Sequence, residues 1–468
     1  MYSEVTSVFV GRTTELATLE KAWRKDGFQL IVMYGRRRVG KSMLLTHFAE
    51  NKRGIYHLAQ ETSPKAALDQ FSQSVAAFTG QIGLHFKDWA EAFDGIAKLT
   101  EPQRLFLIID EFPYLAESDP SLLSLMQNFI DTKLINKSLF LILCGSTISF
   151  MEREVLGAKS PLFGRRTGQM RIEPFDYLTA SRFVPNFSCV NKALTYSVFG
   201  GTPHYLIKMD DENSLAGNII ENVLDPHSYL YDEPILLLKQ ELREPAIYNA
   251  VIEAIACGAS RLNEIATRIG EDVSKCGKYL NTLIDLGFVL RETPIGSKPN
   301  GRKTLYSLSD PFFIFWYSFV FPNRSILERG LSDFVMENEI LPRLNQYAGR
   351  LFERICADFL HRQNMEKKLP FVFRQLGKWW GTDKLRKSQI ELDLVALGNE
   401  ETLLGECKWT NEHVDMQVLS RFIEKGEAFP CEKKSYALLS KSGFTQAVIQ
   451  EAQKQSLSLY TLDDIFDE

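Results

Sequence analysis

The sequence predicts an α/β protein built from several domains. Its 468 residues exceed what one hydrophobic core usually organises, so we expect about two to four domains. Near the start, the apolar run 28–34 is followed by a glycine-containing loop at 35–42 and then by the pattern of a helix. Near the end, residues 389–397 and 402–409 alternate between apolar and polar side chains, as the two strands of a β-hairpin do.

Composition restricts the class of protein. Hydrophobic residues make up 45% and charged residues 24% of the chain, which is typical of a globular protein. A net charge of −5 does not by itself indicate nucleic-acid binding. Seven cysteines without a C-x-x-C pair favour a reducing compartment. The first residues lack the pattern of a secretion signal, and no apolar run reaches the ~18 residues of a membrane span. We therefore expect a cytoplasmic protein with no membrane partner.

Residues 35–42, GRRRVGKS, have the spacing of a phosphate-binding loop between a strand and a helix. Glycine in such a loop lets backbone N–H groups face phosphate oxygens at the helix N-terminus. Lys41 is expected to reach the β and γ phosphates of ATP, and Ser42 to ligate Mg²⁺. The sequence therefore predicts a P-loop NTPase with a parallel sheet. The expected nucleotide-binding residues of this loop are Gly35, Arg36, Arg37, Arg38, Val39, Gly40, Lys41 and Ser42.

Two further strands support a nucleotide site. The run 104–115 ends its apolar part in Asp110, expected to hold Mg²⁺, and Glu111, expected to polarise the attacking water. A helix N-cap is the alternative for this acidic pair. The run 138–147 ends in Ser146 and Thr147, whose hydroxyls would face the γ-phosphate if their strand neighbours the other two. An ordinary turn at the end of a strand is the alternative for Ser146.

Six segments resemble, in their order, the archaeal-type AAA-related P-loop ATPases of the STAND group over roughly residues 8–240. They are FVGRTTELATLEKAW, YGRRRVGKS, LFLIIDEFPYL, LILCGS, SPLFGRRTG and FGGTPHYL. The resemblance implies that Gly11 and Arg12 line the adenine pocket and that Pro203 helps to open a helical lid. It also makes Arg165 or Arg166 a candidate arginine finger, acting in cis or from a neighbouring subunit of a homo-oligomer. Which arginine acts stays open, and the alternative is that both only solvate a loop.

The middle of the chain predicts a winged helix-turn-helix at 245–310. Three helical periods are followed by two alternating strands around a turn rich in Pro, Gly and Asn. Five cations could meet phosphates: Lys275, Lys278, Lys298, Arg302 and Lys303. DNA contact and a structural or protein-binding role both stay open.

The C-terminal hairpin is expected to bring Asp393, Glu406 and Lys408 together. In a regular strand Leu392 and Leu394 share one face and Asp393 lies on the other. The two carboxylates would hold a Mg²⁺ or Mn²⁺ ion, while the lysine would orient or deprotonate a water. Glu353, on a preceding amphipathic helix, would complete the metal shell.

An aspartate followed by E-x-K, after a helix with a glutamate, resembles the PD-(D/E)XK restriction-endonuclease-like fold over residues 346–468. The proline that usually precedes the aspartate is missing, with Leu392 in its place. The alternatives are a surface salt bridge on an edge strand, or a nuclease fold that no longer cuts.

We therefore predict a Mg²⁺-dependent ATPase whose nucleotide state regulates a DNA-directed nuclease-like tail. Besides ATP, double-stranded DNA or another nucleic acid is the expected partner. The alternative is a STAND-type signalling or scaffold ATPase with a catalytically inactive tail that binds nucleic acid or a partner. The predicted domains are a P-loop ATPase core at 1–185, a helical lid at 186–244, the winged helix-turn-helix at 245–310, an aromatic connector at 311–345 and the nuclease-like domain at 346–468.

Overall fold

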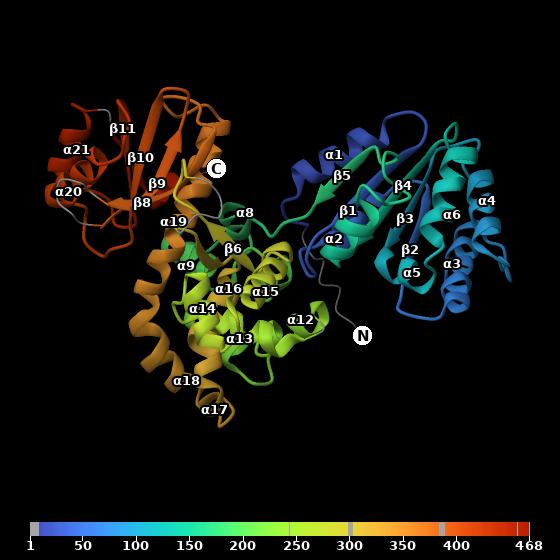
Figure 1. Ribbon diagram of the computed structural model, residues 1–468, viewed down its shortest axis with the longest axis horizontal. Coiled ribbons are helices and arrows are strands. Elements are labelled where there is room, and N and C mark those ends of the chain that lie inside the picture. The colour runs from blue at the N-terminus through green and yellow to red at the C-terminus, as the bar shows by residue number, and fades with distance from the viewer. Residues whose placement is uncertain (1–8, 243, 298–302, 383–388, 456, 468) are drawn as a thin grey trace. The chain divides into compact units, whose positions relative to one another are not determined.

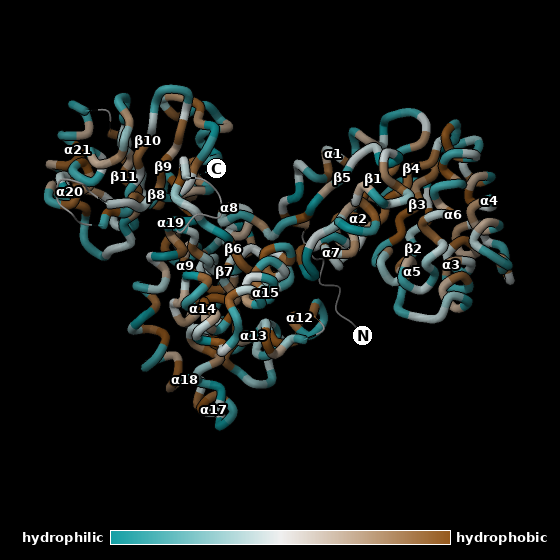
Figure 2. Tube along the Cα trace, in the orientation of Figure 1, coloured by the Kyte–Doolittle hydropathy of each residue, from teal (hydrophilic) through white to brown (hydrophobic). Residues whose placement is uncertain are grey.

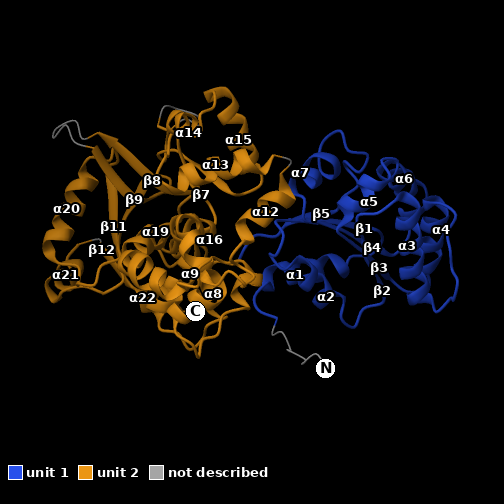
Figure 3. Cartoon of the chain, turned by 90° about the horizontal axis from the view of Figure 1, so that it is seen from below, with its two compact units in different colours: residues 1–174 blue, residues 175–468 orange. Residues whose placement is uncertain are grey.

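The computed structural model describes residues 9–242, 244–297, 303–382, 389–455 and 457–467. The chain divides into two compact units, residues 1–174 and 175–468 (Figure 3). Each unit has its own sheet and its own hydrophobic core. No helix in the described ranges is long and apolar enough to cross a membrane.

The first unit is built on a five-stranded parallel sheet in the order β2-β3-β4-β1-β5 (Figure 1). Its strands are β1 (Gln29–Tyr34), β2 (Gly54–Leu58), β3 (Leu105–Asp110), β4 (Leu139–Gly145) and β5 (Gly168–Arg171). Every residue of β1, β3 and β4 is buried, as expected for parallel strands covered on both faces. Figure 2 shows the hydrophobic colour of β3 and β4. The three strands predicted around the nucleotide site are therefore confirmed.

Helices cover both faces of this sheet. They are α1 (Thr13–Trp23), α2 (Lys41–Ala49), α3 (Pro64–Thr79), α4 (Trp89–Leu99), α5 (Phe112–Ser118), α6 (Leu122–Phe129) and α7 (Ile148–Phe150). Ile31 and Met33 of β1 pack with α1 and α2, whereas Leu30 and Val32 pack with α3 to α6. Alternate residues of one strand thus serve two cores, which explains why β1 is apolar throughout.

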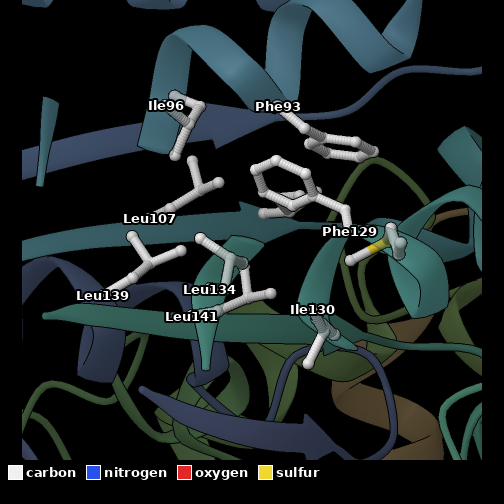
Figure 4. A pocket seen from close by; sticks show the side chains of 10 residues that line it. Phe93, Ile96, Leu107, Phe129, Ile130, Leu134, Leu139 and Leu141 are labelled. Carbon is white, nitrogen blue, oxygen red and sulfur yellow. The ribbon is translucent and has the colours of Figure 1, made fainter. Parts of the chain in front are cut away.

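A small pocket of about 10 Å³ lies in the core between β3, β4 and the helices α4 and α6 (Figure 4). Its lining is entirely apolar and includes Phe93, Ile96, Leu107 and Phe129. A space of this size without polar partners offers nothing that would hold a nucleotide or a metal ion. The pocket is therefore a packing feature of the core.

The second unit begins with helices that share one core. They are α8 (Tyr177–Ser181), α9 (Cys189–Phe199), α10 (Pro203–Leu206), α11 (Leu215–Ile219), α12 (Glu233–Glu241), α13 (Pro245–Ala256), α14 (Leu262–Ile269), α15 (Val273–Asp285), α16 (Pro311–Phe315), α17 (Arg324–Leu327), α18 (Ser332–Val335) and α19 (Leu341–Met365). The segments predicted as lid, helix-turn-helix and connector pack into this single core, with Phe312, Phe313 and Trp316 fully buried in it. After α15 come the antiparallel strands β6 (Val289–Glu292) and β7 (Leu305–Leu308).

The C-terminal part is a second five-stranded sheet, in the order β12-β11-β10-β9-β8. Its elements are β8 (Gln375–Thr382), β9 (Gln389–Leu397), β10 (Glu401–Lys408), α20 (Met416–Glu427), β11 (Lys433–Ser440), α21 (Gln446–Ala452), β12 (Leu457–Thr461) and α22 (Leu462–Phe466). Strands β8, β9 and β10 form an antiparallel meander, and β11 and β12 continue in parallel. Helices α19 and α22 cover one face, and α20 and α21 cover the other.

A β-bulge interrupts the regular alternation predicted for 389–397. Gly377 pairs with Val395 and Trp379 with Leu392, so the register shifts between them. As a result Leu392 packs with α20 and Leu394 with α19, on opposite faces of the sheet. The prediction that Leu392 and Leu394 share a face is wrong, because a bulge places two residues of one strand against one of its neighbour.

Candidate functional site

The P-loop occupies the carboxyl end of β1. Gly35 follows the strand, and a Cβ at this position would lie 2.2 Å from the carbonyl oxygen of Ile172, so only glycine fits. Gly40 has φ of 89° and precedes α2, a left-handed conformation that glycine adopts without strain. Lys41 is 5% exposed, and its ammonium group donates to the carbonyl oxygens of Gly35 and Arg36, each at 2.9 Å. The loop is therefore folded around its lysine.

Asp110 is completely buried at the end of β3 and accepts hydrogen bonds on both oxygens. Ser42 and Tyr56 each donate a hydroxyl to its Oδ2 at 2.6 Å, and the backbone N–H of Glu111 donates to Oδ1 at 3.0 Å. Burial, and then the charge of Asp110, raise the pKa of the Tyr56 phenol, so this hydroxyl remains a donor. A carboxylate beside the serine of the P-loop is the arrangement expected for an oxygen-ligated cation.

Glu111 is held by the end of the neighbouring strand β4. It has φ of 53°, and its Oε2 accepts from the hydroxyl of Ser146 at 2.7 Å and from the amide of Ser146 at 3.3 Å. Strand β4 lies between β1 and β3, so the adjacency on which the prediction for Ser146 depended is present. The direct partner of this hydroxyl, however, is the Glu111 carboxylate.

Arg12 is fixed where the chain enters α1. Gly11 has φ of 70° and Arg12 has φ of 59°. Arg12 is buried, with 8% of its surface exposed. It donates to the carbonyl oxygens of Val39 at 2.8 Å and Glu173 at 2.6 Å, and pairs with Glu15 at 2.7 Å. Arg12 therefore ties the entry segment to the P-loop.

Other arginines of the loop are also engaged. Arg37 donates to the hydroxyl of Tyr114 at 2.8 Å, and Arg38 has φ of 71° within the loop.

The two arginine-finger candidates make contacts within their own unit. Arg165 forms a two-pronged pair with Asp131, at 2.8 and 2.6 Å, which lowers the pKa of that carboxyl. It also donates to the carbonyl oxygen of Pro161 at 3.0 Å. Arg166 donates to the carbonyl oxygen of Leu156 at 2.8 Å. Both guanidinium groups hold the loop between β4 and β5 in shape.

Pro203 begins α10 in the second unit.

The C-terminal hairpin brings Asp393 and Glu406 to one end of β9 and β10. Gly405 pairs with Leu394, which sets Glu406 against Asp393, and Asp393 Oδ2 accepts from the amide of Cys407 at 2.9 Å. Burial, then Glu406 and then Glu353 raise the pKa of Asp393 to about 7. Such a rise is expected where carboxylates gather away from water.

Glu406 is 2% exposed, which is unusual for a charged residue. Its Oε1 accepts from Lys408 at 2.7 Å and from Lys425 at 2.8 Å, whereas its buried Oε2 has no hydrogen-bond partner among the described residues. Burial lowers the pKa of Lys408, but Glu406 and Asp393 raise it more, and the net pKa is raised. Lys408 is therefore an ammonium ion at neutral pH, which favours orienting a ligand over deprotonating a water.

Glu353 of α19 pairs with Lys378 of β8. Within the described ranges no three His, Cys, Asp or Glu side chains are arranged so that they could hold a metal ion. That Glu353 completes a metal shell with Asp393 and Glu406 stays a prediction; in this structure the Glu353 carboxylate is paired with the Lys378 ammonium.

Family models match two parts of the chain. The model described as "ATPase domain predominantly from Archaea" matches residues 9–209, and DUF234, described as "Archaea bacterial proteins of unknown function", matches residues 316–419. The uncharacterized protein MJECL04 of Methanocaldococcus jannaschii is 35% identical over 404 residues, which are 86% of this chain and 88% of that protein. The chain belongs to this archaeal-type ATPase family.

Further similarities agree with the ATPase family. The uncharacterized ATP-binding protein MJ0423 of Methanocaldococcus jannaschii is 52% identical over 46 residues, which are 10% of this chain and 78% of that protein. The Walker-type ATPase PABY2304 of Pyrococcus abyssi has the same fold, with a TM-score of 0.50 and 20% identity over 66% of this chain and 96% of that one. The ATPase prediction is thus confirmed at family level. Membership of the STAND group and the restriction-endonuclease-like likeness stay predictions.

Of the five cations predicted on the three-helix and hairpin segment, Lys275 pairs with Glu271 at 3.4 Å, and Lys278 and Lys303 are exposed. Lys298 and Arg302 lie outside the described residues.

Three residues that the structure places at these sites were not predicted from the sequence, namely Tyr56, Lys378 and Lys425. Tyr56 lies on β2, which pairs with β3 and so faces Asp110. Lys425 is on the helix after the E-x-K strand, where a scan for cations on that helix could have found it. Lys378 depends on the β-bulge, for which the sequence gives no signal.

Proposed function

We propose that this ATPase hydrolyses ATP with Mg²⁺ and that its nucleotide state controls a metal-dependent, restriction-endonuclease-like nuclease in its C-terminal domain, with double-stranded DNA as substrate. The ATPase part rests on the family and on the buried contact between Ser42 and Asp110. The nuclease part rests on one observation above the others, the buried Glu406 carboxylate whose Oε2 lacks a partner in the described structure.

At the nucleotide site, the residues present fit a Mg²⁺ ion. Ser42 Oγ and the Asp110 carboxylate are the hard oxygen donors that Mg²⁺ prefers, and they lie together. When bound, Mg²⁺ neutralises charge on the β and γ phosphates. Lys41 would exchange its loop carbonyl partners for phosphate oxygens. Glu111, steadied by Ser146, would orient the attacking water and accept its proton.

The C-terminal residues fit a divalent ion held by two carboxylates. Asp393 and Glu406 follow the Leu394–Gly405 pair at the same end of the hairpin, and the Glu406 Oε2, without a partner among the described residues, is an acceptor that a cation would satisfy. A Mg²⁺ or Mn²⁺ ion bound there would supply Lewis acidity toward a phosphate oxygen. Lys408, as an ammonium group, would hold the scissile phosphate or a water beside it. The order α19, β8, β9, β10, α20 and β11, with an antiparallel meander joined to a parallel strand, supports the restriction-endonuclease-like proposal.

Three helices followed by a two-stranded hairpin support a winged helix-turn-helix as the DNA-contacting module. Lys278 and Lys303, both exposed, are the cations that would meet phosphates from the third helix and from the hairpin.

The test is cleavage of plasmid and linear DNA with Mg²⁺ or Mn²⁺, with and without ATP. We expect Asp393→Ala and Lys408→Ala each to stop cleavage while ATP hydrolysis continues, because both residues lie in the C-terminal domain. Lys433→Ala is the matched control, since Lys433, at the start of β11, forms an exposed ion pair with Glu400. Intact cleavage in Asp393→Ala would refute the site.

A specific observation also favours a second function, a signalling or scaffold ATPase with an inactive tail. The ammonium groups of Lys378, Lys408 and Lys425 already neutralise the carboxylates Glu353 and Glu406. On this alternative the tail binds a partner or nucleic acid without cutting. Absence of cleavage under every metal and nucleotide condition, together with DNA binding that survives Asp393→Ala, would support it.

A further inference from the structure

Lys378 lies at the β-bulge of the C-terminal sheet, next to the carboxylates. The pairs Gly377–Val395 and Trp379–Leu392 flank the bulge, so Lys378 alone stands against both Asp393 and Leu394. Bulges commonly re-aim a side chain next to a functional site. Here the bulge lies opposite Lys378, whose ammonium group contacts Glu353 of α19.

The ammonium of Lys378 pairs with Glu353 Oε2, and the two side chains are 32% and 23% exposed. Lys378 is therefore charged at neutral pH. It is the direct cationic partner of a carboxylate that also influences Asp393.

We infer that Lys378 is a positioning residue that holds Glu353 as its internal counter-ion, competes with a divalent cation for that carboxylate, and is itself kept in place by the β6–β7 hairpin. This inference rests on the proposed metal-dependent function of the C-terminal domain. It assigns to the hairpin a regulatory connection to the metal site.

Two residues, Ile295 and Arg354, join the hairpin to the strand that carries Lys378 and the helix that carries Glu353. The backbone N–H of Ile295, just after β6, donates to the carbonyl oxygen of Lys378 at 2.8 Å. The Ile295 side chain packs against Gly377, where an added Cβ would lie 3.6 Å from Ile295 Cβ. From the other side, Arg354, which follows Glu353 in α19, donates to the carbonyl oxygens of Ser309, at 2.7 Å, and Leu308 at the end of β7.

The consequence is a mechanical link between the hairpin and the carboxylates. Ile295 is bonded to the backbone of Lys378, so a displacement of the hairpin would shift the part of β8 from which the Lys378 side chain reaches Glu353. With Lys378 in place, Glu353 is neutralised and two carboxylates remain for a cation. With Lys378 displaced, a third carboxylate becomes available, and affinity for a divalent ion rises with the number of charged ligands.

The test is titration of the full-length protein with Mn²⁺ by calorimetry, without nucleotide. Asp393→Ala defines the part of the binding that belongs to the C-terminal site. In Lys378→Met we expect the dissociation constant of that part to fall by about tenfold or more, because a positive charge has left the site. Lys378→Arg, which keeps the charge, and Lys433→Met, from the exposed pair with Glu400, should match the wild type.

A second variant tests the hairpin. Ile295→Ser removes the packing against Gly377 and should also lower the dissociation constant for Mn²⁺. The expected change is about threefold, smaller than in Lys378→Met, because the lysine charge remains. If Asp393-dependent binding exists but is equal in Lys378→Met and wild type, the inference is overturned and the proposed function stands. If neither protein shows Asp393-dependent binding, both are overturned. If only Ile295→Ser has no effect, the link to the hairpin is overturned. Melting curves with and without Mn²⁺ check that each variant is folded.

Discussion

Replacing Ser146 by alanine tests whether the end of β4 positions Glu111 for catalysis or contributes to nucleotide binding. In the structure the Ser146 hydroxyl donates to Glu111 Oε2 at 2.7 Å. A hydrogen bond to a charged acceptor contributes about 1.5–3 kcal/mol, which corresponds to about 10- to 150-fold in rate if the bond persists in the transition state. The longer bond from the Ser146 amide, at 3.3 Å, survives the substitution. We therefore expect kcat for ATP hydrolysis to fall by about 10- to 30-fold, near the lower end of that range.

Steady-state ATP hydrolysis measures kcat, and binding of a fluorescent ATP analogue measures affinity separately. If Ser146 steadies Glu111, kcat falls while nucleotide affinity stays within about twofold, because the interaction acts on the attacking water. Thr147→Ala is the matched control, since the adjacent Thr147 begins α7 without a side-chain capping hydrogen bond. Equal losses in Ser146→Ala and Thr147→Ala, or an unchanged kcat in Ser146→Ala, would refute this reasoning.

Other predictions concern the first unit. Lys41→Ala should abolish ATP hydrolysis, because it removes the cation of the P-loop, and unchanged turnover would remove the ATPase assignment. Glu111→Gln should keep ATP bound while slowing hydrolysis by about 100-fold or more; equal loss of binding and turnover would make Glu111 structural. Burial lowers the pKa of His57 from 6.5 to about 4. The stability that neutral His57 confers is thus complete above pH 6.5 and is lost as the pH falls toward 4, by about 3 kcal/mol. Denaturant unfolding at several pH values should show this loss, and His57→Gln should remove it.

The nucleotide site could be predicted because its signals are local. GRRRVGKS carries its strand, loop and helix within a few residues, and Asp110 and Glu111 end a strand apolar enough to be recognised as buried. The order that places β4, and so Ser146, between β1 and β3 comes from the structure, because the sequence left that adjacency as a condition. What the sequence could not supply is the partner of each hydroxyl. Tyr56 reaches Asp110 only because β2 pairs with β3.

The C-terminal site was predicted in part. The hairpin that carries Asp393 and Glu406 was predicted from the alternation of apolar and polar residues and from the turn between the strands, and the structure contains this hairpin. The bulge opposite Lys378 does not follow, because it depends on how β8 pairs with β9 rather than on either strand alone. For the same reason the pairing of Glu353 with Lys378, which changes what the carboxylates can hold, could not be read from residue spacing.

Anomalous diffraction from crystals grown with Mn²⁺ and ADP would show whether Asp393 and Glu406 bind a divalent ion. A Mn²⁺ ion at Ser42 and Asp110 of the nucleotide site would serve as the internal control. We expect a second anomalous peak within coordination distance of Asp393 and of Glu406 Oε2, the buried oxygen that has no partner among the described residues. A peak at the nucleotide site alone, with Glu406 still bound by Lys408 and Lys425, would contradict it.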